Sequence, residues 1–191
     1  MKQWKNMTNN KIILGIVGEN SSGKTTITEY LQKTQNAVCF RFSGMLGDIL
    51  ARLYLEPTRQ NFQTLSTILR QNFSEDLMSK VIAIDVKNSP AQFIITEGVR
   101  RPTDITYLQD NPGFHLVAVN TNEKTRFERV KSRREKPDDA TKTWEEFQKE
   151  SNQESEQKIR EIAAQAEFVI DNNGTQEQLY HQIDEIIKKI S

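Results

Sequence analysis

An apolar run, a glycine-rich loop and a helical pattern follow one another near the start of the chain. Residues 12–17 are apolar, residues 18–25 read Gly-Glu-Asn-Ser-Ser-Gly-Lys-Thr, and residues 26–33 suit a helix. This is the order of a phosphate-binding loop, whose glycines let successive backbone N–H groups turn toward an anion. Lys24 can reach the β- and γ-phosphates, Thr25 can offer its hydroxyl to Mg²⁺, and the helix start is electropositive. A Gly/Ser-rich turn that merely carries a lysine is the alternative, but the flanking strand and helix favour a nucleoside triphosphate site.

The bulk composition argues against several other classes of protein. The chain has 191 residues, enough for one α/β domain with a core. Lys+Arg and Asp+Glu are equal at 26 each, so nothing indicates binding to polymeric nucleic acid. No stretch approaches the ~20 apolar residues of a membrane span, and the start of the chain lacks the apolar core of a signal peptide. The single Cys39 is expected to be a small buried hydrophobe. We therefore expect a cytoplasmic protein whose partner is a small molecule, with no membrane.

Five apolar runs are expected to form buried parallel strands, with helices between them. These runs lie at residues 12–17, 37–42, 93–96, 116–119 and 168–170. The alternation predicts an α/β fold of the P-loop NTPase type, a five-stranded parallel sheet with helices on both faces. We expect residues 1–10 to be a polar extension and residues 11–191 to be a single domain.

Two longer stretches interrupt the alternation. Residues 45–89 hold about three helices' worth of sequence, broken near Pro57 and around residues 72–74. Residues 125–166 are rich in Glu, Gln and Lys, with a break at residues 133–139. We expect the first stretch to be a helical insertion that binds the acceptor.

Helix caps stand out in the second half of the chain. Thr143 with Glu146 can cap a helix, and Thr175 with Gln178 can cap the last one. The polarity of residues 145–160 is the kind that usually marks a solvated helix face.

A carboxylate and two arginines follow the third apolar run. Glu97 ends the run, and Arg100 and Arg101 come shortly after it. Because ligands collect at the carboxyl ends of parallel strands, Glu97 can hold Mg²⁺ or its waters, and the arginines can hold a second phosphate. A surface Arg-Arg pair before a turn is the alternative. The segment resembles the Asp-Gly-x-Pro-Arg element of adenylate-kinase-type nucleoside monophosphate kinases, which aligns Arg101. It is also similar to the Asp-Val-Arg-Phe-Pro-Asn-Glu segment of phage-type deoxynucleoside monophosphate kinases, which aligns Arg100, so both arginines stay candidates.

The stretch after the fourth run carries a second resemblance. Residues 126–134 resemble the Arg-x-x-Gly-Arg-Arg entrance to the lid of nucleoside monophosphate kinases. The resemblance implies that Arg129 packs on the adenine and that Arg133 neutralises the transferring phosphoryl group. The Asp-Asp pair at residues 138–139 fits the acidic pair beyond the lid, so residues 133–143 would form a short lid. Helical spacing alone would also suit a solvated stripe.

A third resemblance lies in the helical insertion. Residues 59–70 look like the Arg-x-x-x-Gln-x-x-Gly-Thr-x-x-x-Arg stretch of deoxynucleoside monophosphate kinases. The polar positions recur at three- and four-residue steps and share one helix face, which would bind the acceptor. They are Arg59, Gln63, Ser66 and Arg70. A separate apolar face, expected to meet the core, consists of Phe62, Leu65 and Leu69.

Two other segments bear on the identity of the acceptor. Residues 166–179 are similar to the ending of dephospho-CoA kinases and of the phage-type kinases, and the resemblance implies that this loop passes beside the adenine. After the second run, adenylate kinases carry Thr-Gly-Asp-x-Leu-Arg, whereas residues 43–48 read Ser-Gly-Met-Leu-Gly-Asp. The family's phosphate arginine is missing there, and Arg41 or Arg59 would have to replace it. This departure argues against adenylate kinase itself and leaves the acceptor open.

Together these features favour a P-loop kinase that transfers the γ-phosphoryl group of Mg-ATP to a phosphorylated small molecule. A (deoxy)nucleoside monophosphate is the favoured acceptor. Dephospho-CoA and phosphomevalonate are alternatives, as is a kinase-fold ATPase that acts on a macromolecular partner. A GTPase is disfavoured because the stretch after the fourth run lacks Asn-Lys-x-Asp, and an AAA-type machine because the chain is too short for its helical lid domain. The sequence does not indicate the base preference or the oligomeric state.

The residues expected to build the site fall into four groups. Catalysis is assigned to Lys24, Arg100, Arg101, Arg129 and Arg133. ATP binding is assigned to Gly18, Glu19, Asn20, Ser21, Ser22, Gly23, Lys24, Thr25, Thr26 and Arg129. Mg²⁺ binding is assigned to Thr25 and Glu97. Acceptor binding is assigned to Arg41, Ser43, Arg59, Gln63, Arg70, Arg100 and Arg101.

Overall fold

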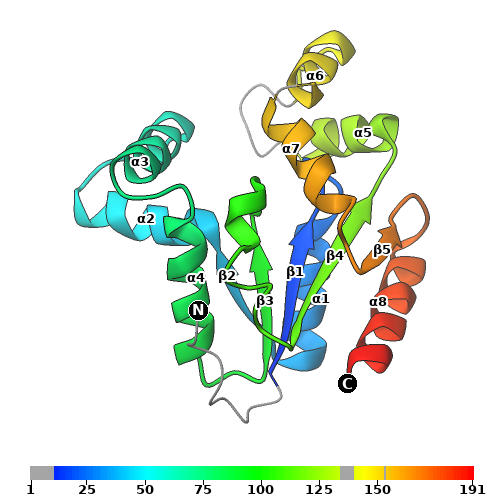
Figure 1. Cartoon of the computed structure of the whole chain (residues 1–191). Coiled ribbons are helices and arrows are strands. Elements are labelled where there is room, and N and C mark those ends of the chain that lie inside the picture. Colours follow the sequence, from blue (N-terminus) through cyan, green and yellow to red (C-terminus); the bar gives the residue numbers. More distant parts are fainter. Residues whose placement is uncertain (1–10, 134–139, 153) are drawn as a thin grey trace.

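Five short strands pair into one parallel sheet (Figure 1), in a computed structural model that describes residues 11–133, 140–152 and 154–191. The strands are β1 (Ile12–Val17), β2 (Val38–Arg41), β3 (Phe93–Glu97), β4 (Phe114–Asn120) and β5 (Phe168–Asp171). The five expected strands are confirmed, with shifted ends. The fourth begins earlier than expected, at Phe114, and the second ends at Arg41 because Phe42 already belongs to a helix.

The strand order is β2-β3-β1-β4-β5, so β1 lies in the middle between β3 and β4. Every residue of β3 is buried, as is all of β1 except the partly exposed Ile12. Strands covered on both faces need no polar side to meet water, which is why these segments read as continuous apolar runs. Since all pairs are parallel, the ends of β1, β3 and β4 meet at one edge of the sheet.

Helices cover both faces of the sheet, as expected. They are α1 (Lys24–Gln35), α2 (Phe42–Arg52), α3 (Arg59–Asn72), α4 (Leu77–Asn88), α5 (Glu123–Arg133), α6 (Trp144–Ser151), α7 (Glu154–Ala163) and α8 (Gln176–Ile190), with the short 3₁₀ helix η1 (Pro102–Ile105). One apolar layer joins the sheet to α1 and α8, through Ile27, Leu31 and Ile183 among others. The other layer joins it to α2, α4 and α7, through Leu46, Ile82 and Ile162 among others.

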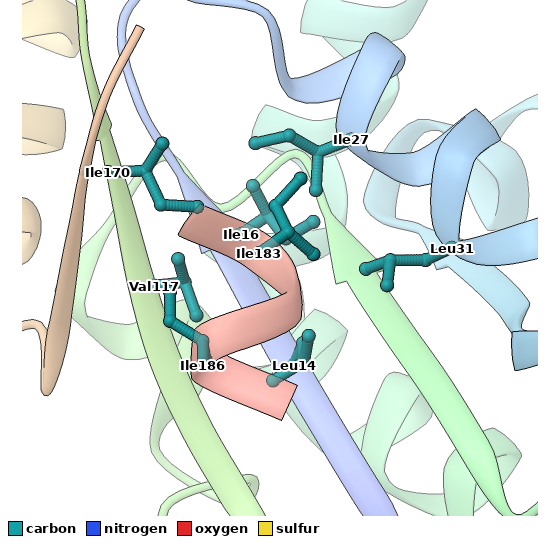
Figure 2. Close-up of a pocket in the computed structure, with 8 residues that line it drawn as sticks. All are labelled: Leu14, Ile16, Ile27, Leu31, Val117, Ile170, Ile183 and Ile186. Atoms are coloured by element: carbon teal, nitrogen blue, oxygen red, sulfur yellow. The ribbon is translucent and has the colours of Figure 1, made fainter. Parts of the chain in front are cut away.

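The layer under α1 and α8 contains a small cavity, shown in Figure 2. Its walls are side chains of the core, including Ile16, Ile27 and Ile183, and all the lining residues are aliphatic. A cavity without polar groups gives a nucleotide nothing to bind. It is therefore an imperfection of core packing and not a ligand site.

The helical insertion breaks into α2, α3 and α4 near the two expected points. Thr58 caps α3 by accepting a hydrogen bond from the backbone N–H of Asn61 at 3.2 Å. The apolar face of α3 packs against the core, as expected from its spacing; it consists of Phe62, Leu65 and Leu69.

The charged stretch after β4 forms α5, α6 and α7. The expected capping box at Thr143 is present, since its hydroxyl accepts from the N–H of Glu146 at 3.2 Å. The expectation of a solvated face at residues 145–160 is only partly right, because Phe147 and Ile159 are buried. The short lid expected at residues 133–143, with its Asp-Asp pair at 138–139, falls largely outside the described residues.

None of the helices in the described part of the chain has the length and apolar character that a membrane span requires.

A buried ion pair fastens α3 to the segment that follows β3. Arg70 is 6% exposed, and its Nη2 lies 2.6 Å from Oδ1 of Asp104. Asp104 also accepts, through Oδ2, the backbone N–H groups of Arg100 (2.9 Å) and Arg101 (3.0 Å). Arg70 in addition donates to the backbone carbonyl of Glu75. The pair therefore joins the insertion to the loop that carries the two candidate arginines.

We expect Arg70→Ala to lower the free energy of unfolding by about 3–5 kcal/mol, because it leaves the Asp104 carboxylate buried without its partner. Arg59→Ala is the matched control, since Arg59 is exposed at the start of the same helix. Its effect should stay within about 0.5 kcal/mol. Urea unfolding of both variants measures the difference. Equal losses in the two variants would contradict the anchoring role.

Candidate functional site

The loop after β1 is shaped by two glycines that cannot carry a side chain. Gly23 has φ of +103°, a conformation that L side chains rarely adopt, and a Cβ there would collide with Nδ2 of Asn172. A Cβ on Gly18 would lie 2.5 Å from Oγ of Ser22 and 2.8 Å from the carbonyl oxygen of Val119. The glycine positions of the motif are therefore required by the packing of the loop as well as by its backbone path.

Neighbouring loops hold the phosphate loop in place from one side. The carbonyl oxygen of Ser22 accepts from Oγ1 of Thr121 at 3.0 Å and from Nδ2 of Asn172 at 2.7 Å. Thr121 follows β4 and Asn172 follows β5, so three strand ends converge on this carbonyl. Sequence reasoning did not single out Asn172, which reads as one residue of an ordinary Asp-Asn-Asn-Gly turn.

Lys24 is already in a position to meet a phosphate. Its Nζ donates to the carbonyl oxygens of Gly18 and Glu19, both at 2.8 Å. An ammonium group has three N–H donors, so one remains for a ligand oxygen. Burial lowers the pKa of Lys24 to about 8, while the negative charge of Glu97 opposes that shift. The side chain is thus still cationic at neutral pH, and a bound anion would favour its charged form.

Three buried polar atoms in and around the loop lack a partner among the described residues. They are Oγ of Ser21 and Oγ of Ser22, in the loop itself, and Nη1 of Arg129, on α5. The other terminal nitrogen of Arg129 donates to the carbonyl oxygen of Asn172 at 2.9 Å. Burial also lowers the pKa of the Arg129 guanidinium, so burial of its charge has a cost. Phosphate oxygens would satisfy hydroxyl and guanidinium donors of this kind, and the site therefore fits an anionic ligand.

Glu97 lies where the sequence placed a metal anchor, at the end of β3 and paired in register with Ile16 of β1. It is 8% exposed, and its Oε2 is 3.0 Å from Nε of Arg41 and 3.4 Å from Oγ1 of Thr28. The contact with Glu97 raises the pKa of the Arg41 guanidinium. A carboxylate beside a phosphate loop suits Mg²⁺, and Thr25, exposed at the start of α1, could add its hydroxyl.

Cys39 on β2 lies beside this carboxylate, with its Sγ 4.0 Å from Oε2 of Glu97. Burial raises the pKa of the thiol to about 11, with the Glu97 charge as the second cause. The thiol is therefore protonated at neutral pH and is a poor nucleophile.

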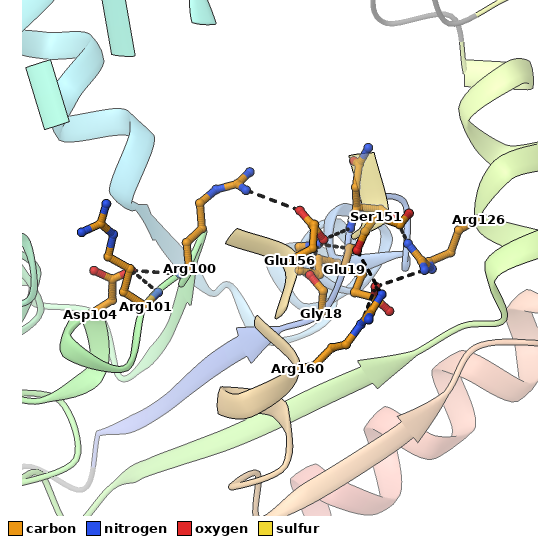
Figure 3. Close-up of polar contacts among 11 residues, drawn as sticks. Gly18, Glu19, Arg100, Arg101, Asp104, Arg126, Ser151, Glu156 and Arg160 are labelled. Carbon is orange, nitrogen blue, oxygen red and sulfur yellow. Dashed lines mark hydrogen bonds and ion pairs between the residues drawn. The ribbon is translucent and has the colours of Figure 1, made fainter. Parts of the chain in front are cut away.

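Glu19 carries a contact that sequence reasoning missed. Its Oε1 lies 3.1 Å from Nη2 of Arg126 on α5 and 2.8 Å from Nη2 of Arg160 on α7 (Figure 3). Arg126 is almost fully buried, and its guanidinium lies over the ring of Phe147. Glu19 is thus held between α5, which precedes the expected lid, and α7. Only the polarity of α7 was visible in the sequence, and polarity alone does not show a partner 141 positions away.

The two candidate phosphate arginines diverge. Arg100 extends toward the phosphate loop, with its Nη1 3.7 Å from Oε1 of Glu156, and its side chain is 63% exposed. Arg101 pairs instead with Glu75, at 3.0 Å, in the turn before α4. Figure 3 shows the two guanidinium groups pointing to different sides of the loop. Of the two alignments, the geometry favours the one that uses Arg100.

The expected acceptor residues do not all reach the site. The assignment of Arg70 to acceptor binding is corrected, because its guanidinium forms the buried ion pair with Asp104 and cannot face an acceptor. Arg59, Gln63 and Ser43 are exposed, and Arg133 is exposed at the end of α5. Figure 1 shows α3 and the α5–α6 region on opposite sides of the carboxyl ends of the strands.

A family model described as an AAA domain matches residues 14–158 of this chain. The description names the domain alone, and not the AAA-type machine with a helical lid domain that the sequence analysis disfavoured. Among curated proteins, the chain is 27% identical to a UPF0200 protein of Methanocaldococcus jannaschii, over 94% of this chain and 90% of the relative. It is 28% identical to a UPF0200 protein of Thermococcus kodakarensis, over 94% of this chain and the whole relative.

Solved structures share the fold at low sequence identity. A shikimate kinase from Bacteroides thetaiotaomicron is 14% identical, with a TM-score of 0.63, and covers 94% of this chain and 98% of that one. The protein TT1252 from Thermus thermophilus is 15% identical, with a TM-score of 0.59, over 95% and 98%. These likenesses confirm the P-loop kinase fold and leave the branch of nucleoside monophosphate kinases unconfirmed.

We expect binding of an ATP analogue near pH 8.5 to take up protons, because the triphosphate favours the ammonium form of Lys24 and raises a pKa that starts at about 8. Calorimetric titration in two buffers of different ionisation enthalpy measures this uptake. Lys24→Arg is the control, since a guanidinium stays charged at this pH and leaves no proton to take up. Equal uptake by both proteins would show that another group titrates.

Proposed function

The chain belongs to the family described as the AAA domain, and on this premise we propose that it is an ATP-dependent kinase of small molecules. The observation that carries the proposal is the phosphate loop itself. It holds Lys24 with one N–H left for a phosphate, near a buried nitrogen of Arg129 that has no partner in the described part of the chain. We expect the protein to act in the cytoplasm.

In this proposal the residues act by position and charge. Lys24 and Arg129, with Arg133, would neutralise charge on the transferring phosphoryl group, since such reactions need little covalent help from the protein. Thr25 and Glu97 would hold Mg²⁺, which would supply positive charge to neutralise the phosphates. The Glu97 carboxylate is already oriented by Arg41 and Thr28.

The favoured acceptor is a phosphorylated small molecule, first of all a (deoxy)nucleoside monophosphate. Arg41 contacts Glu97 and Arg100 contacts Glu156 beside the loop, and both side chains are partly exposed and able to receive its phosphate. Guanidinium groups suit this role because their planar donors match two phosphate oxygens at once. Dephospho-CoA and phosphomevalonate remain alternative acceptors. Arg59 and Gln63 would contact the acceptor only if α3 moved toward the loop.

A second candidate function is an ATPase that acts on a macromolecular partner. The observation that favours it is a group of exposed apolar side chains on and around α3, where Tyr54 is 91% and Phe73 71% exposed. Exposed apolar patches often mark interaction surfaces. Tyr54 precedes α3 and Phe73 follows it. Both therefore lie in the helical insertion that the first proposal gives to the acceptor.

A coupled assay of ADP formation across candidate acceptors tests the proposal. Turnover that requires one acceptor, and a phosphorylated product seen by mass spectrometry, would support a kinase. Lys24→Ala should abolish this turnover, because it removes a charge-assisted contact to the transferring group, at a cost of several kcal/mol. Hydrolysis of ATP that no small acceptor changes would favour the second candidate.

We expect Arg100→Ala to raise KM for the acceptor roughly 10- to 100-fold, the loss of one hydrogen bond to a charged group, with less effect on KM for ATP. Arg101→Ala is the matched control, because the guanidinium of Arg101 pairs with Glu75 and points away from the phosphate loop. It should change KM less than about threefold. Steady-state kinetics decides between them, and a larger effect from Arg101 would restore the alternative alignment.

A further inference from the structure

Helix α7 presents two opposite charges to adjacent residues of the phosphate loop. Glu156 and Arg160 are four residues apart and so share one face of the helix. Arg160 pairs with the side chain of Glu19 at 2.8 Å, whereas Oε2 of Glu156 accepts from the backbone N–H of Asn20 at 3.4 Å. The arginine contact fixes the loop from outside. The glutamate contact uses a backbone donor that belongs to the anion-binding loop.

Glu156 is a buried carboxylate in a place that suits a phosphate. It is 9% exposed, and its second oxygen faces Arg100 at 3.7 Å (Figure 3). Its negative charge also raises the pKa of Lys24, although burial lowers that pKa by more. A backbone N–H, an arginine and the loop lysine thus surround one anionic group of the protein itself. These are the donor types that bind phosphate oxygens at such loops.

We propose that Glu156 is an internal competitor of the terminal phosphate of the nucleotide and thereby sets which nucleotides bind tightly. In the empty protein its carboxylate takes the Asn20 N–H and Arg100, and it leaves both when a γ-phosphate binds. The inference rests on the proposed nucleotide site. It places the γ-phosphate near Glu156, because Lys24 marks the end of the loop that the β- and γ-phosphates approach.

Two consequences follow from this exchange of partners. A γ-phosphate meets like-charge repulsion from Glu156 that a shorter nucleotide avoids, so the carboxylate penalises ATP more than ADP. Displacement of Glu156 also releases Arg100, the arginine proposed to hold the acceptor. Nucleotide binding therefore prepares the acceptor side of the site without any new residue.

Glu156→Gln tests the competition, because it keeps the shape and removes the charge. Titration calorimetry with Mg²⁺ and either a non-hydrolysable ATP analogue or ADP gives the two dissociation constants. We expect the variant to bind the ATP analogue roughly tenfold more tightly, as loss of one repulsive charge contact implies, with less than threefold change for ADP. Glu161→Gln on the exposed side of the same helix is the matched control and should change neither.

The other outcomes of these titrations also decide whether Glu156 acts as a competitor. Equal tightening for both nucleotides, no change, or weaker binding of the ATP analogue by Glu156→Gln would overturn the competitor role while leaving the proposed function intact. Glu156→Asp, which keeps the charge, should retain the wild-type preference, and tight ATP binding by that variant would also count against the role. If the wild-type protein binds neither nucleotide, the proposed function fails and the inference fails with it.

Discussion

The parallel pairing of β1 between β3 and β4 is the constraint on which the rest of this protein depends. It brings the ends of three strands to one edge of the sheet, so the loop after β1 lies beside Glu97 of β3 and Thr121 after β4. Apolar layers on both faces hold the strands in register. The backbone N–H groups of the loop can then converge on an anion at that edge, where ligands of parallel sheets collect.

Charge compensation is the second theme of the structure. Several arginines around the site are paired with carboxylates of the same chain, as with Arg41 and Glu97 or Arg100 and Glu156. Isolated buried charges would be costly, and these pairs reduce that cost in the empty protein. A phosphate that contacted Arg41 or Arg100 would exchange partners with a carboxylate. Selectivity can therefore arise from the strength of the internal pair as well as from contacts to the ligand.

Much of the fold and the loop could be predicted from local patterns. The strand before the loop, the two glycines and Lys24 follow from rules that act within a few residues. The site around them could not, because its contacts join residues far apart. Arg70 looked like one member of a polar stripe, yet the neighbouring core and Asp104 bury it. Arg160 looked like part of a solvated helix, yet it meets Glu19.

The sequence by itself determined that this chain builds a parallel sheet and a phosphate-binding loop, since hydrophobic period and glycine spacing are local properties. Tertiary structure alone decided which charged groups meet that loop. Helical spacing places a residue on a face, but it does not say whether that face meets water, a core or another charge. Arg100 and Arg101 are adjacent in the chain and point to different carboxylates for this reason, because the packing of α4 and α7 supplies Glu75 on one side and Glu156 on the other.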